Sequence, residues 1–239
     1  MPRALARGFR LGLALLVLLL LAGCASTAPR LVEGVKADSR LGEGRRILVM
    51  PLDVELAELL ASGLAEPRAA WTEQATRHLN EAFSAELARR GAEAVPYDPA
   101  LLDEAGAARV RQLELLHEVV ASSLLMNELG PAKLPTKPGY DWTLGPGVRV
   151  LGEYQQADYA LFTLVRDSYA SGGRKALMAI GLIAGVGVSL GQQVGFVSLV
   201  DLKTGQLVWS NFLVSGSGDL REAEPAAKVA GQLLEKLPL

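Results

Sequence analysis

The pentapeptide GVSLG at residues 187–191 matches the G-x-S-x-G pattern that presents a nucleophilic serine in hydrolases. That chemistry needs a strand before Ser189, a helix after it, and an acid followed by a histidine further along the chain. The only histidines, His78 and His117, both precede the motif. The glycines of this stretch would suit a dinucleotide loop only if a helix followed, and the sequence predicts a strand there. We therefore expect neither a catalytic serine nor a bound cofactor.

His78 and His117 are also the residues that would bind a metal ion. The sequence predicts them on two different helices, and neither has a carboxylate at the short spacing typical of a metal site. We therefore expect boundary or solvent positions for both histidines, and no metal site.

Four acids and one tryptophan complete the set of candidate binding residues. Aspartates near strand ends would form a cation or sugar site if they came together, but such residues more commonly cap turns and helices. Trp142 belongs to a long loop with four prolines, residues 130–147, and we expect it to seal an edge of the core rather than to recognise a ligand. The four acids are Asp158, Asp167, Asp201 and Asp219.

Composition excludes several classes of function. The chain has one cysteine, Cys24, so it forms no internal disulfide. Its 24 basic and 26 acidic residues give a net charge of −2. Residues 1–23 contain three arginines and no acid, so their removal leaves a net charge of about −5. Nucleic acid is not an expected partner, because phosphate binding requires a basic face.

The N-terminus has the pattern of a secretory signal. Three arginines precede an apolar run, Leu11–Leu21, that is too short to span a bilayer. The residues that follow, LAGC at 21–24, resemble the lipobox of bacterial lipoproteins, an ordinary signal peptide being the alternative. The resemblance implies cleavage between Gly23 and Cys24 and three acyl chains on Cys24, which is more than stable anchoring needs. In that family Ala25, in place of an aspartate, favours the outer membrane.

The rest of the chain divides into a tether and one domain. Residues 24–44 are mostly small or polar and predict a lipidated flexible tether of roughly 25 Å root-mean-square span. Residues 45–239 are enough to bury one core and predict a single α/β domain after the signal peptide, 1–23.

Periodicity predicts the elements of this domain. The apolar run at 47–52 is typical of a strand buried on both faces, and a four-residue spacing from Trp71 to Leu87 predicts a helix that ends at Gly91. A second helix should turn Leu113, Leu116, Val120 and Leu124 inward. The predicted strands are 47–52, 93–98, 157–170, 193–202 and 206–214, and the predicted helices are 69–91, 101–129, 148–156 and 224–238.

These elements predict an α/β fold with a mixed sheet of about five strands flanked by helices. Their order is β-α-β-α-β-β-β-α, apart from the short helix at 148–156, and an apolar glycine-rich insert precedes the C-terminal hairpin. Gly205 lies in the tight turn of that hairpin.

The apolar insert, ALMAIGLIAGVGVSL at 176–190, carries no charge and is shorter than a spanning helix. Burial against the domain's own sheet is the interpretation we prefer. Self-assembly or partner binding is the second, and insertion into a bilayer is the third, because the run lacks the alternation of a barrel strand. A helix would place small residues on neighbouring turns for close packing, and the candidate assembly glycines are Gly181, Gly185, Gly187 and Gly191.

Four local sequences, in this order, resemble a known group: ILVMPL at 47–52, AELARRGAEAVPYD at 85–98, LGEYQQADYALF at 151–162 and SLVDLKTGQLVWS at 198–210. They look like the CsgG-like curli-transport lipoproteins and the amino-terminal domain of the Tol-Pal translocation protein. The similarity is greatest to uncharacterised proteobacterial lipoproteins of that superfamily, over about residues 46–237. It implies a mixed sheet flanked by helices and a largely non-enzymatic role in envelope assembly or export.

The predicted function is that of an outer-membrane lipoprotein facing the periplasm, a non-enzymatic structural or assembly component of an envelope or export system. Its acyl chains would bind the membrane, and a second copy or another envelope protein is a further candidate partner. One alternative is a periplasmic module that binds glycan or a small ligand through residues 130–147. Another is a subunit of a pore-forming export channel.

Overall fold

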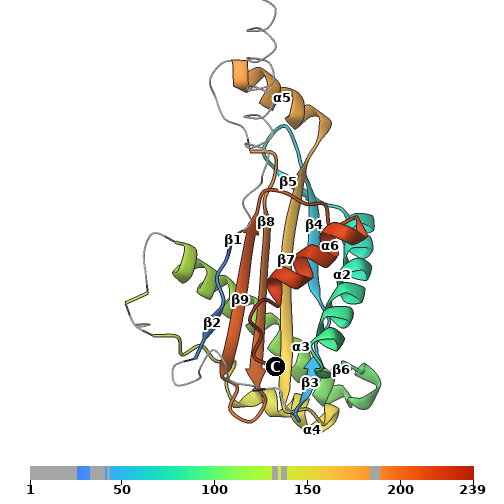
Figure 1. The fold of residues 1–239 in the computed structure, drawn as a ribbon, viewed down its shortest axis with the longest axis vertical. Helices are drawn as coiled ribbons and strands as arrows, with labels where there is room; N and C mark the ends of the chain where they lie inside the picture. The colour runs from blue at the N-terminus through green and yellow to red at the C-terminus, as the bar shows by residue number, and fades with distance from the viewer. Residues whose placement is uncertain (1–25, 33–40, 42–43, 131–133, 136–138, 184–188) are drawn as a thin grey trace, which may run out of the picture.

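The computed structural model describes residues 26–32, 41, 44–130, 134–135, 139–183 and 189–239. Within them, one mixed nine-stranded sheet lies between helices on both faces (Figure 1). The predicted signal cleavage and lipid sites, Gly23 and Cys24, and the candidate assembly glycines Gly185 and Gly187 lie outside the described residues.

The sheet has the strand order β1-β9-β8-β7-β3-β6, with β2 also paired to β9 and β4 paired to β7 and β5. Strand β7 pairs in parallel with β3 and β4, and in antiparallel with β8. The strands are β1 Ser26–Thr27, β2 Arg30–Leu31, β3 Arg46–Val49, β4 Asp53–Leu59, β5 Ala65–Pro67, β6 Glu93–Pro96, β7 Tyr159–Ala170, β8 Gln193–Asp201 and β9 Leu207–Ser215.

Alternating side chains of the central strands fill two separate cores. On one face, helices α2 and α6 cover Leu161 and Val165 of β7; on the other, α3 and α4 cover Phe162 and Leu164. A fifth helix, α5, projects beyond one end of the sheet (Figure 1). The helices are α2 Ala69–Arg89, α3 Glu104–Leu129, α4 Arg149–Gln155, α5 Gly172–Ile183 and α6 Ala223–Leu233.

The predicted fold class and element order are confirmed, but the sheet has more strands than the expected five. The first predicted strand ends at Val49, and after a short break β4 and β5 form a hairpin that was not among the predicted elements. Strands β1 and β2 lie within the predicted tether and pair with β9. Two residues are too few to show a periodic pattern. The backbone hydrogen bonds that define these strands come from β9, which is distant in sequence.

The helix stripes are confirmed for α2 and corrected for α3. Ala75, Leu79, Phe83 and Leu87 are buried on α2, and Gly91 takes a φ of 73° just after the helix. On α3, His117 is buried and Leu116 is exposed, the reverse of the prediction. The inward residues of α3, Val110, Leu113, His117, Ala121 and Leu124, follow helical spacing, so the buried stripe passes through the histidine.

Candidate functional site

The candidate site is the end of the sheet from which α5 projects. Strand β7 ends at Ala170 and α5 begins at Gly172, so the strand leads directly into the helix. Arg174 fixes the base of the helix: its Nε donates to the carbonyl oxygen of Ser189 at 2.7 Å, and its Nη1 donates to that of Leu60 at 3.4 Å. Three chain segments therefore meet at the base of α5.

Large apolar side chains are exposed here. Ile180 is 64% exposed, Ile183 is 90% exposed, and Leu64, on the adjoining β4–β5 loop, is 69% exposed. We call this surface the apolar end; it comprises Leu64, Leu177, Ile180, Leu182, Ile183 and Leu190. The preferred interpretation, burial of the insert against the domain's own sheet, is therefore wrong for α5. The helix leaves the sheet and keeps only Gly181 buried.

The N-terminal part of the described chain starts near the same end. Ser26 pairs with Val214 on β9, Val214 pairs with Val194 on β8, and Val194 pairs with Arg166 on β7. This row lies four residues before β7 ends at Ala170. Because β9 runs toward α5 and β1 is antiparallel to it, β1 begins at the α5 end and runs away from it.

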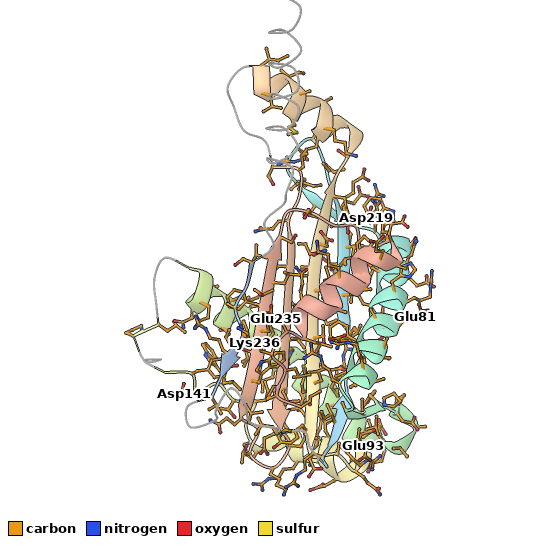
Figure 2. The ribbon with its side chains drawn as sticks, in the orientation of Figure 1. Glu81, Glu93, Asp141, Asp219, Glu235 and Lys236 are labelled. Carbon is orange, nitrogen blue, oxygen red and sulfur yellow. The ribbon has the colours of Figure 1, made fainter. Side chains whose placement is uncertain are left out.

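The opposite end of the sheet is charged. Nη1 of Arg45 lies 3.0 Å from Oδ1 of Asp158, and Nε of Arg46 lies 3.4 Å from Oε1 of Glu93. Figure 2 shows Glu93 at this end, far from α5. This end therefore carries paired charges, whereas residues 176–183 of α5 carry none.

A polar pocket of about 430 Å³ lies just below the apolar end. The guanidinium of Arg221 lies 4.4 Å from the ring centroids of both Trp71 and Tyr169, and its Nη2 is 2.6 Å from Oδ2 of Asp219. The backbone N–H of Leu220 donates to the hydroxyl of Tyr169. These contacts fix the 216–222 loop to β7, so the pocket has a clear structural role.

The four candidate acids do not form one site. Asp167 and Asp219 lie toward the α5 end, whereas Asp158 and Asp201 lie at the charged end. Asp201 caps its turn as predicted, since it accepts from the backbone N–H groups of Lys203 and Thr204. Asp167 lies three residues before the end of β7, near a strand end as predicted, but its side chain is buried.

The two histidines lie on opposite faces of the sheet, so they cannot share a metal ion. His78 is half-buried on α2. His117 stacks on Phe162 and its Nε2 lies 2.9 Å from Oγ of Ser198, which contradicts the expected boundary or solvent position. Burial lowers the pKa of His117 to about 4. No cluster of three or more His, Cys, Asp or Glu suited to a metal occurs among the described residues.

The remaining candidates are placed as follows. Trp142 is 7% exposed and belongs to the core beneath α3, which confirms the sealing role. Ser189 is exposed beside α5, and its Oγ accepts only from the N–H of Gly191 among the bonds of the described residues. None of the helices within the described ranges combines the length and apolar character that crossing a bilayer requires.

Comparisons with known proteins give only distant structural similarities. No protein-family profile and no curated protein matches the chain. Among solved structures, the PelC dodecamer from Paraburkholderia phytofirmans is 13% identical, with a TM-score of 0.41 over 90% of this chain and 98% of that one. The LpoB C-terminal domain from Salmonella enterica is 14% identical, with a TM-score of 0.27 over 77% and 86%. The resemblance to CsgG-like lipoproteins stays a prediction.

Proposed function

We propose that this chain is an outer-membrane-anchored periplasmic lipoprotein that serves as a non-enzymatic structural or assembly component of a cell-envelope or export system. One observation carries the proposal. The first described strand, β1, starts two residues after Cys24, and it starts at the end of the sheet where α5 exposes apolar side chains. Lipidation of Cys24 would therefore hold the apolar end close to the membrane.

A second exposed apolar surface supports a protein partner. On α3, Leu115, Val119 and Met126 are exposed, and their spacing of four and seven residues places them on one side of the helix. Exposed apolar stripes of this kind mark contact sites in soluble domains. A glycan-binding role through residues 130–147 has less support, because Trp142, the candidate recognition residue of that loop, is buried.

Replacement of the acceptor thiol tests the proposal. In a Gram-negative host, the wild-type chain should incorporate labelled palmitate and fractionate with the outer membrane. Cys24→Ser should lose both properties, because it has no thiol for acylation. The matched control is Ala25→Asp, which should keep palmitate and shift to the inner membrane. Palmitate on the Cys24→Ser chain, or its absence from the wild type, would refute the anchor.

A further inference from the structure

We infer that the apolar end is a second membrane contact, with α5 lying in the interfacial region of the bilayer that holds the acyl chains. The inference rests on the proposed anchor at Cys24 and extends it. Lipid, in place of a second copy of the chain, covers this surface.

The composition of α5 favours a lipid environment. Residues 176–183, ALMAIGLI, contain no polar side chain, so this part of the helix has no polar side. A helix that is apolar all round is normally buried in a protein core or in a membrane. Here Leu177, Ile180, Leu182 and Ile183 are exposed instead.

The length of α5 sets how it can enter a bilayer. Its 12 residues span about 18 Å, whereas the hydrocarbon core is about 30 Å thick. The helix can therefore lie within one leaflet but cannot cross. Leu64 and Leu190 flank its base and would extend the same contact.

The position of the chain start selects the membrane over other partners. Ser26, two residues after the proposed anchor, lies in the α5-proximal half of the sheet. Two residues of extended chain reach at most about 7 Å, so the acyl chains would be tied to the domain by a very short link. A domain tied this closely can turn its charged end to the bilayer only if β1 leaves β9. With β1 paired, the acyl chains and the apolar end approach the same surface.

Charge at the base of α5 fits the same orientation. Arg174 and Lys175 occupy the first turn, before the apolar part of the helix begins. If α5 enters the bilayer, these two basic side chains would lie at the level of the anionic headgroups, which attract them. Beyond them every α5 side chain is apolar, as insertion below the headgroups requires.

A depth measurement tests the inference on the intact lipoprotein. Acylated Cys24 leaves no other thiol, so Ile180→Cys can be labelled with one environment-sensitive nitrobenzoxadiazole dye. The control is Leu115→Cys, at a position on α3 that is 53% exposed. The protein is reconstituted at about one copy per vesicle of phosphatidylethanolamine and phosphatidylglycerol. We expect doxyl-labelled lipids to quench the dye at position 180 several-fold more strongly than at position 115.

Each other outcome has a defined meaning. Equal, weak quenching at both positions would overturn the inference. The inference would also be overturned if the doxyl lipids did not quench the dye at position 180 and if that dye became shielded only when several copies shared a vesicle. A second copy of the chain would then cover α5. Failure of the lipid anchor would be detected separately in two ways. The dye would also label a free thiol at Cys24, and the unlabelled protein would no longer float with the vesicles.

Discussion

The hydroxyl of Tyr169 donates a 2.5 Å hydrogen bond to Oδ2 of Asp167, on the strand that leads into α5. Nε2 of Gln193 donates to the same oxygen at 2.8 Å. Burial nevertheless raises the pKa of Asp167 to about 6, because desolvation of the charged form outweighs these hydrogen bonds and one from the backbone of Ser168.

Asp167→Asn should change how stability depends on pH. A carboxyl group whose pKa is higher in the folded than in the unfolded protein contributes its full stabilisation at pH values below the unfolded pKa. For Asp167, this contribution to the free energy of unfolding is lost as the pH rises toward 6. The loss for Asp167 is about 3 kcal/mol. Asparagine can keep an oxygen acceptor for Tyr169 and does not titrate. Denaturant unfolding should therefore show the free energy of unfolding of the variant rising relative to that of the wild type between pH 4 and pH 6. A difference in this free energy that stays constant with pH would contradict a buried carboxyl group.

His117→Gln should give the opposite change. The pKa of His117 is lowered to about 4 by burial, so about 3 kcal/mol of stability present above pH 6.5 is lost as pH falls to 4. Glutamine can keep a hydrogen bond to Ser198 without titrating. Relative to the wild type, the variant should therefore gain stability as pH falls, and Asp167→Asn should lose it. Parallel profiles for the two variants would show that one of these side chains is not buried.

Gly191→Ala should destabilise the protein strongly. Gly191 has a φ of 133°, and an added Cβ would lie 1.9 Å from the carbonyl oxygen of Ser168. The substitution should cost about 2 kcal/mol or more and lower the melting temperature. The control, Gly231→Ala in α6, meets no atom within 4 Å and should stabilise by about 0.5–1 kcal/mol. Similar melting temperatures for the two variants would argue against the strained turn before β8.

Trp71→Ala should have a moderate cost. Trp71 is half-buried, edge-on to Tyr169 at 6.0 Å between centroids, and covered by Arg221. We expect a loss of about 2 kcal/mol, less than the roughly 3–5 kcal/mol typical of a fully buried aromatic residue. Trp71→Phe should recover part of it. Phe83 is 1% exposed. A loss of stability from Trp71→Ala as large as that from Phe83→Ala would contradict the half-buried position of Trp71.

Local patterns predicted the parts of the fold that depend on one segment. The stripe from Ala75 to Leu87, the end of α2 at Gly91 and the hairpin turn at Gly205 follow from residues close in sequence. The strand status of Ser26–Thr27 does not, because its partners on β9 are almost 190 residues away. The inward position of His117 required knowledge of which side of α3 meets Phe162.

The candidate site was the least predictable part. The sequence marked residues 176–190 as apolar but did not show whether the sheet would cover them. That outcome depends on where β7 ends: the strand runs to Ala170, and α5 extends beyond the described part of the sheet (Figure 1). The nearness of β1 to the same end depends on pairing with β9, which no local pattern reveals.

Mass spectrometry of the intact wild-type chain, extracted from outer membranes, is the sharpest test of the lipid anchor at Cys24. We expect a mature chain that begins at Cys24 and carries three acyl chains, with no unmodified form. A mature chain that begins at any other residue, or a free Cys24 thiol, would contradict it.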